Sequence, residues 1–210
     1  MNSEQFVNTI KLYNKEDFEN NIVNLHIHTI FSDGKADAFD ILSQAKEKGY
    51  KKIAITDHNT VEAHRLIQDE ILIPAVEFDV WCGYVFVHLL AYGIDINHPD
   101  LQEFYAKNKK ETEANIVRIF SKRNIKKLIR AIHNAGGIAV LAHPACYWAI
   151  SLDFMVKKLV SYGLDGIEVY YPYDRLRSVV KFHSRKTVEK IADKYNLIKT
   201  GGTDLHEVEL

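Results

Sequence analysis

Short apolar runs recur along this chain of 210 residues, and each ends in a polar group that contains histidine, aspartate or glutamate. The first group holds His26 and His28, and because a β-strand turns residues i and i+2 to the same face, these two imidazoles can share one metal ion. A single histidine near a strand is more often a hydrogen-bonded core or surface residue. Six of the ten histidines stand at such strand ends, however, and core packing does not require that. The other groups are Thr56-Asp57-His58, Val76-Glu77, Val87-His88, Leu141-Ala142-His143-Pro144 and Thr203-Asp204-Leu205-His206.

The apolar runs alternate with amphipathic segments, which predicts a single-domain α/β protein with a largely parallel sheet, open or closed as a barrel. The polar groups then meet at the carboxyl ends of the strands, where such folds build functional sites. Strands are predicted at 23–28, 52–56, 72–77, 84–92, 138–142, 166–170 and 197–200, and helices at 36–48, 61–69, 100–123, 125–135, 152–162 and within 176–195.

Composition narrows the classes of protein that the chain can belong to. Hydrophobic residues make up 47% of it, and 27 basic side chains nearly balance 28 acidic ones, so no global field favours nucleic acid or an acidic membrane surface. The two cysteines are too few for a disulfide framework, which favours the reducing cytoplasm. No apolar run is long enough to predict a signal peptide or a membrane span, and no obligate protein partner is evident.

Several candidate ligands also have an ordinary structural reading. Asp33, in Ser32-Asp33-Gly34, reads in isolation as a turn aspartate, and His88, inside an apolar run, reads as a core histidine. Glu77 ends a strand, where a buried carboxylate needs a partner or a cation. The whole set exceeds the four ligands of a structural zinc and suits two or three divalent ions, with manganese, zinc or iron favoured by the absence of thiolates. The nine candidate ligands are His26, His28, Asp33, His58, Glu77, His88, His143, Asp204 and His206.

Taken in order, these motifs resemble those of the PHP (polymerase and histidinol phosphatase) superfamily, over roughly residues 22 to 206. The resemblance implies a distorted (β/α)7-type barrel and a trinuclear metal centre with a phosphoesterase activity, in which a metal-bridging hydroxide is the nucleophile. It also implies that Glu77 bridges metals and that Asp57 orients His58 or a neighbouring ligand. Glu77, Asp57 and His206 are therefore the candidate catalytic residues. Residues 1–21 are expected to be an N-terminal leader segment and 22–210 the PHP domain.

Within that superfamily, residues 163–172 and the Gly201-Gly202-Thr203-Asp204 motif look most like the branch that hydrolyses nucleoside 3′,5′-bisphosphates and short oligonucleotides. The expected substrate is a phosphate monoester of a small nucleotide. A 5′-3′ exonuclease on short oligonucleotides, a histidinol-phosphate-type phosphatase and a non-catalytic metal-binding module are the alternatives.

The chain departs from that branch between the fourth strand and the Ala142-His143-Pro144 motif. The connection at 97–135 is short, which predicts a reduced helical cap, and an arginine that commonly accompanies substrate phosphate is absent there. Arg118 is a candidate replacement. Arg175, Arg177 and Lys181 are further candidates for binding phosphate, although a solvated helix surface explains them equally well.

Overall fold

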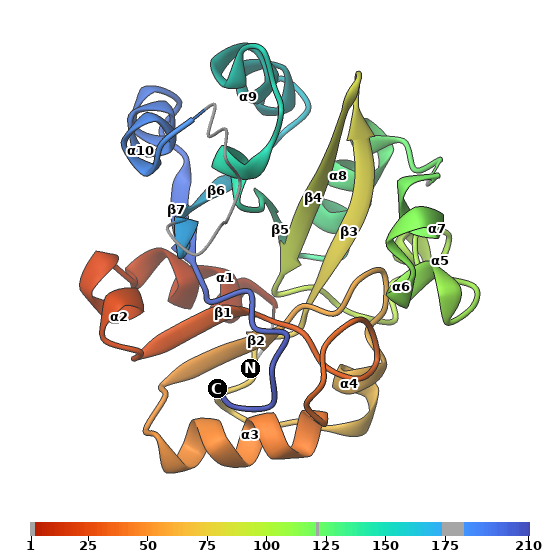
Figure 1. Cartoon of the computed structure of the whole chain (residues 1–210), viewed down its shortest axis with the longest axis vertical. Helices are drawn as coiled ribbons and strands as arrows, with labels where there is room; N and C mark the ends of the chain where they lie inside the picture. The colour runs from red at the N-terminus through yellow and green to blue at the C-terminus, as the bar shows by residue number, and fades with distance from the viewer. Residues whose placement is uncertain (1–2, 121, 174–182) are drawn as a thin grey trace.

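The structure is a computed structural model that describes residues 3–120, 122–173 and 183–210. Its strands form two sheets (Figure 1). In one sheet β1 and β2 pair in parallel, and in the other five strands follow the order β3-β4-β5-β6-β7. The strands are β1 (Val23–Ile27), β2 (Lys52–Ile55), β3 (Ala75–Cys82), β4 (Val85–Tyr92), β5 (Ile138–Leu141), β6 (Gly166–Tyr170) and β7 (Ile198–Gly201).

The two sheets are joined by single bridges between residues rather than by continuous ladders. Ile53 bridges to Leu72, and Ile27 bridges to Leu205 beyond the end of β7. The register of β1 against β2 also shifts between Asn24 and Ile27. Among the described residues the strands therefore do not close into one hydrogen-bonded barrel, and the predicted barrel is not confirmed, whereas the mixed α/β class is.

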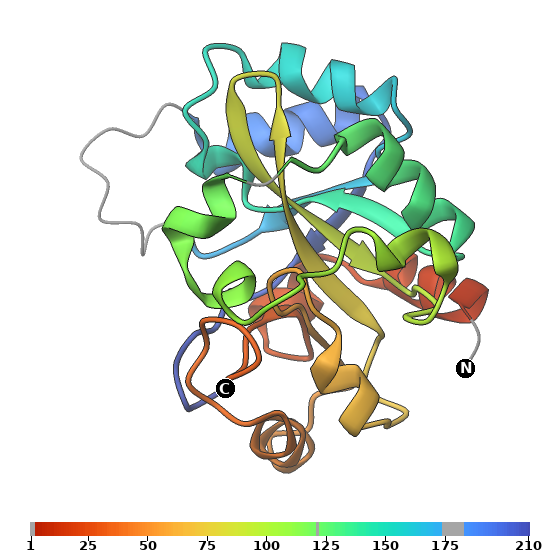
Figure 2. The ribbon, with the colours of Figure 1, turned by 90° about the vertical axis from the view of Figure 1, so that its right-hand side faces the viewer.

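The segment from β3 to β4 is an antiparallel hairpin, which differs from the largely parallel pairing that the sequence predicts. It turns at Gly83, whose φ of +67° suits glycine, and Figure 2 shows it running along the length of the molecule. The predicted strand 72–77 is wrong in extent, because β3 begins at Ala75 and continues through Asp79 to Cys82. Pairing opposes Asp79 to His88, so the hairpin places both side chains beside Glu77.

Helices cover the two sheets from several sides (Figure 1). The α3 helix lies beside β1 and β2, α8 packs on β3 and β5, and α10 packs on β6. None of the described helices is both long and apolar enough to cross a membrane. The helices are α1 (Ser3–Leu12), α2 (Lys15–Glu19), α3 (Ala38–Glu47), α4 (Glu62–Leu66), α5 (Pro99–Gln102), α6 (Lys110–Glu113), α7 (Asn115–Ile119), α8 (Ile125–Asn134), α9 (Leu152–Val160) and α10 (Arg185–Lys194), with a 3₁₀ turn, η1, at Pro144–Cys146.

Residues 3–19, within the expected leader segment, form α1 and α2 and contribute to the core. Phe6, Ile10 and Phe18 are buried in one apolar cluster with Tyr92. Each such side chain contributes about 1.5–3 kcal/mol when it is fully buried. The first two helices are therefore an integral layer of the fold.

The long helix predicted at 100–123 is wrong, because three short helices stand there instead. The backbone N–H of Ala106 donates to the carbonyl of Asn59, which draws the chain away from a helical path. Ala114, between α6 and α7, has extended dihedral angles (φ −93°, ψ 103°). Trp81 Nε1 then donates to the carbonyl of Ile119 at 2.7 Å and fastens α7 to β3. This connection brings Arg118 toward the hairpin.

Candidate metal centre

The fold brings all nine predicted ligands into one cluster. Their donor atoms form four overlapping groups, and within each group the atoms lie no more than 4.8 Å from one another. The donors come from β1, the loops after β1 and β2, the hairpin, the turn after β5 and the segment after β7. The four groups are His28-Asp33-His58-His206, His26-Glu77-His143, His26-His28-Asp204 and His58-Glu77-His88.

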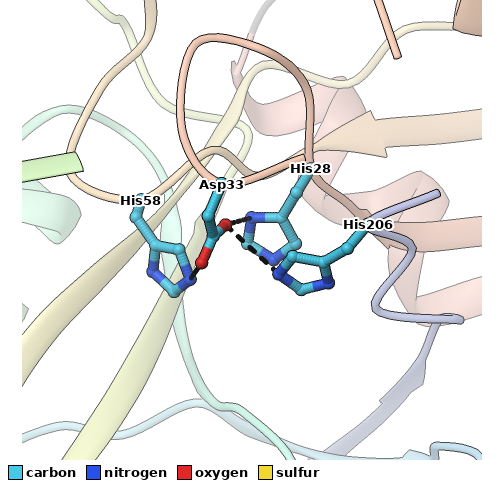
Figure 3. Close-up of side chains that lie close together, drawn as sticks. All are labelled: His28, Asp33, His58 and His206. Carbon is cyan, nitrogen blue, oxygen red and sulfur yellow. Dashed lines mark ion pairs between the residues drawn. The ribbon is translucent and has the colours of Figure 1, made fainter. Parts of the chain in front are cut away.

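The group of four side chains centres on the Asp33 carboxylate (Figure 3). Asp33 Oδ1 lies 3.2 Å from His206 Nε2 and 3.7 Å from His28 Nδ1, and Asp33 Oδ2 lies 3.6 Å from His58 Nε2. Three imidazoles from distant parts of the chain thus face one carboxylate.

The Glu77 carboxylate belongs to two of the other three groups and has five imidazole neighbours. Its side chain is fully buried, and its two oxygens face different imidazoles, so this one carboxylate would serve two donor groups. Glu77 Oε2 lies 3.4 Å from His26 Nε2, 3.3 Å from His28 Nε2 and 3.3 Å from His58 Nδ1, and Oε1 lies 3.2 Å from His88 Nδ1 and 3.3 Å from His143 Nε2.

Several of these buried atoms have no hydrogen-bond partner. They include Nε2 of both His26 and His28, Nδ1 of His58 and both oxygens of Glu77. A buried polar atom without a partner is costly, and a shared cation removes that cost for a whole group at once. Imidazole and carboxylate donors without thiolate match zinc, manganese and iron. The residues present therefore fit divalent metal ions.

The electrostatics of the cluster also favour positive charge. Burial opposes ionisation of Glu77, but the imidazoles of His26 and His88 outweigh it and hold the pKa of Glu77 well below its usual value. Burial likewise opposes protonation of His28, yet the nearby carboxylates of Asp204 and Glu77 outweigh it and raise the pKa of His28 to about 9. Because metal ions displace these protons, metal binding here is coupled to proton release.

Backbone strain and close packing are concentrated in the same motifs. His143 and Asp204 adopt positive φ angles of 22° and 51°, a conformation that functional sites commonly hold. A Cβ at Gly202 would lie 2.4 Å from His26 Cβ, so only glycine lets the segment after β7 approach β1 so closely. A Cβ at Gly34 would lie 2.5 Å from the carbonyl oxygen of His28, with the same consequence for the loop after β1.

Glu168 on β6 supports the cluster, although the sequence analysis did not select it. Its carboxylate accepts from His26 Nδ1 at 3.0 Å and from the backbone N–H of His143 at 2.8 Å. With Nδ1 so engaged, His26 turns Nε2 toward the centre. The available signal was a carboxylate inside the apolar run of 166–170, where a buried charge needs a partner. Tyr171 plays a similar part by donating to Asp204 Oδ2 at 2.8 Å.

Asp57 contacts the loop after β1 and has no described hydrogen bond with His58. Its Oδ1 accepts from the Thr29 N–H at 2.7 Å and from Ser32 Oγ at 2.6 Å, and its Oδ2 accepts from Thr29 Oγ1 at 2.6 Å. Asp57 therefore holds the loop that carries Asp33, which makes its influence on the ligands indirect.

Of the candidate phosphate-binding residues, Arg118 lies in the cluster. It contacts Asp33 and His58 together with Asp79, a fully buried carboxylate that the sequence analysis missed. The signal for Asp79 was its place two residues after Glu77 on one strand, the spacing of His26 and His28. The other three candidates, Arg175, Arg177 and Lys181, lie outside the described residues.

Solved structures share this fold. An amidohydrolase from Chromobacterium violaceum, whose structure holds sulfate and no metal, superposes with a TM-score of 0.72 at 18% identity, covering 88% of this chain and 87% of that one. A Bifidobacterium adolescentis protein considered a metal-dependent phosphoesterase gives a TM-score of 0.68 at 21% identity, with the same coverage of both chains.

Proteins similar in sequence are named as enzymes that cleave phosphate esters. The 5′-3′ exoribonuclease Rnm of Escherichia coli (strain K12) is 28% identical over 200 residues, which cover 84% of this chain and 67% of the relative. A phosphoribosyl 1,2-cyclic phosphate 1,2-diphosphodiesterase of Eggerthella lenta is 23% identical over 255 residues, covering 88% of this chain and 94% of the relative.

The fold and the cluster together define an enzyme of the metal-dependent phosphoesterase class. Residues 24–153, more than half of the chain, match the PHP domain. The chain therefore belongs to the PHP domain family.

Proposed function

We propose that this enzyme hydrolyses a phosphate monoester of a small nucleotide, with a nucleoside 3′,5′-bisphosphate as the expected substrate. The observation that carries the proposal is the convergence of four donor groups, two of which contain Glu77. Clustered cations suit phosphate esters, which bear negative charge on several oxygens. Two free cysteines support a cytoplasmic setting.

Divalent ions, when bound, would lower the pKa of a water molecule so that hydroxide is available as a nucleophile near neutral pH, and would place positive charge against the phosphoryl oxygens. The chain supplies the geometry. Glu77 contributes its carboxylate to two of the donor groups. Glu168 fixes the orientation of the His26 ring. We assign the transfer of a proton to a departing oxygen to His206, because its side chain is 35% exposed at the rim of the cluster. Arg175, Arg177 and Lys181 remain our candidates for binding the substrate phosphate.

Substitution of the shared ligands tests this proposal. We expect His28→Ala and Glu77→Gln to lose bound metal and more than about 100-fold in kcat/KM together, because both residues serve more than one donor group. Metal content is measured by elemental analysis, phosphate release by a colorimetric assay and folding by circular dichroism. His133→Gln, which changes a histidine outside the cluster, serves as the control and keeps both properties. Full activity in the metal-free enzyme would refute the proposal.

A 5′-3′ exonuclease activity on short oligonucleotides is the second candidate, and the Escherichia coli exoribonuclease relative favours it. The two activities differ in product, so release of inorganic phosphate from a nucleoside bisphosphate is compared with release of mononucleotides from a 5′-phosphorylated oligonucleotide. Histidinol phosphate belongs in the same substrate panel. Stable metal binding without turnover of any of them would instead indicate a non-catalytic metal-binding module.

A further inference from the structure

Arg118 places a buried positive charge against the donor atoms of the metal centre. Its side chain is 4% exposed, and it reaches the cluster from α7. Nη1 donates to Asp33 Oδ2 at 2.6 Å, and Nη2 lies 2.6 Å from His58 Nε2. Both partners belong to the group of four that also contains His28 and His206.

The contact with His58 decides what else that group can bind. A neutral imidazole has one lone pair, and a guanidinium nitrogen only donates, so His58 Nε2 is the acceptor in this contact. The same lone pair cannot ligate a metal ion at the same time. Asp33 Oδ2 is engaged in the same way, and the atoms left without partners are Asp33 Oδ1 and His58 Nδ1. Because Nε2 of the neutral ring accepts, His58 Nδ1 carries the proton and faces the Glu77 carboxylate on the side away from Arg118, so His58 offers no lone pair to an ion on that side either.

The guanidinium is held in place by a second buried carboxylate. Asp79 Oδ2 accepts from Arg118 Nε at 3.0 Å, and Asp79 Oδ1 lies 3.3 Å from Nη2. Asn59 holds Asp79 in turn, because its Oδ1 accepts from the Asp79 N–H at 3.0 Å and its amide donates to the Asp79 carboxylate. Withdrawal of Arg118 would remove the guanidinium that neutralises Asp79, which is fully buried. Trp81 also fastens α7 to β3.

We propose that the Arg118 guanidinium takes the place of a third cation in the His28-Asp33-His58-His206 group, so that the centre holds two divalent ions around Glu77. The centre then keeps one positive charge that chelation does not remove. Arg118 acts as a positioning residue for Asp33 and His58, and its donors are not available to a substrate phosphate. The inference rests on the proposed metal centre and is independent of which phosphate ester is cleaved.

Metal stoichiometry tests this inference directly. The protein is stripped of metal, equilibrated with buffered zinc or manganese alone, and analysed by elemental analysis and native mass spectrometry. We expect two ions per chain in the wild type and three in the double variant Arg118→Met/Asp79→Asn, which removes both members of the buried pair. The third ion should bind roughly 100-fold more tightly to the double variant than to the wild type.

Arg123→Met is the matched control, because Arg123 is also partly buried in this connection and donates to the backbone carbonyls of Phe104 and Asp79. It should keep two ions. Circular dichroism checks that each variant folds. Anomalous diffraction from wild-type crystals soaked in zinc needs no variant and should show peaks around Glu77 and none between Asp33 and His58.

Three tightly bound ions in the wild type, or the same number in the wild type and the folded double variant, would overturn the inference. So would an anomalous peak between Asp33 and His58, or the absence of any bound metal. Two ions in the wild type and three in the double variant would support the inference about Arg118 even if no phosphate ester were cleaved. Failure of the inference can therefore be told apart from failure of the proposed function.

Discussion

The placement of individual side chains in this centre depends on residues that are not themselves candidate ligands. Asp57 is the clearest case, since three donors from Thr29 and Ser32 converge on its carboxylate. These bonds order the loop between His28 and Asp33. A ligand on a loop is only as well placed as the loop itself.

Asp57→Asn should therefore loosen this loop. The amide nitrogen of asparagine would face a donor, which leaves a buried polar group unsatisfied at a cost of about 1–3 kcal/mol. We expect a lower free energy of unfolding and a metal affinity reduced by about 10-fold or more. Urea denaturation and competition with a chromophoric chelator measure the two effects.

Asp37→Asn is the control for this substitution, because Asp37 caps α3 by accepting from the Phe39 N–H and asparagine caps a helix equally well. If Asp57→Asn changed neither stability nor metal affinity, the loop would have to be ordered by other contacts.

The members of the cluster were predictable from sequence because each stands in a short motif, and all nine candidate ligands lie close together. Asp79 was missed because its partner Arg118 is 39 residues away, on a segment whose path is set by tertiary contacts. Glu168 was missed for a similar reason, since its partner His26 lies 142 residues away. Local spacing identifies the donors, but it does not identify the side chains that orient them.

Secondary-structure elements that depend on local sequence were predicted correctly, whereas those that depend on tertiary contacts were not. The strand at 166–170 and the helix that begins at 125 agree with their predictions, because apolar periodicity is a local property. The hairpin was not predicted as such, since an apolar run carries no information on whether its neighbour pairs in parallel or antiparallel. The prediction of one helix at 100–123 failed because the backbone bond from Ala106 to Asn59 breaks the helical path. That bond joins segments far apart in sequence, so local periodicity does not reveal it.

Helix α8 offers a pH-dependent contact outside the metal centre. His133, near its end, lies with Nε2 2.7 Å from Asp165 Oδ2, and Asp165 also accepts from the Ala139 N–H of β5. The hydrogen bond with Asp165 raises the pKa of His133 above its ordinary value, against a smaller opposing effect of burial. This contact therefore stabilises the fold fully below pH ~6.5, the unfolded pKa, and the contribution is lost as pH rises through the folded pKa.

His133→Gln should accordingly destabilise the protein more at pH 5.5 than at pH 9. Because the pair is partly exposed, we expect a difference of only about 0.5 kcal/mol. Urea denaturation of both proteins at the two pH values measures it. An equal cost at both values, or a larger cost at pH 9, would contradict the assigned ion pair.

At the scale of the whole molecule, the candidate metal centre lies where the segment after β7 meets β1 and the loop that follows β1. The His28 N–H donates to the carbonyl of Leu205 at 2.9 Å, and the Lys35 N–H donates to the carbonyl of His206 at 3.0 Å. Asn24 Nδ2 donates to Thr203 Oγ1 at 2.8 Å. The segment after β7 is thus attached to β1 and its loop by a few bonds, while its ligand side chains face the same cluster.

Removal of metal should therefore act on this closure more than on the rest of the fold. Ions that bind only the native state stabilise it by about 4 kcal/mol at 1,000 times their Kd, so chelation should lower the melting temperature. Chelation also leaves the buried carboxylates and imidazoles without the ions between them, which should speed amide exchange at 29–35 and 202–206 in particular. Hydrogen exchange with mass spectrometry, with and without chelator, measures this, and α9 serves as the internal reference because it contributes no ligand. Equal acceleration in α9 would mean that the ions stabilise the molecule globally, and no acceleration anywhere would mean that the backbone bonds to Leu205 and His206 close the molecule without metal.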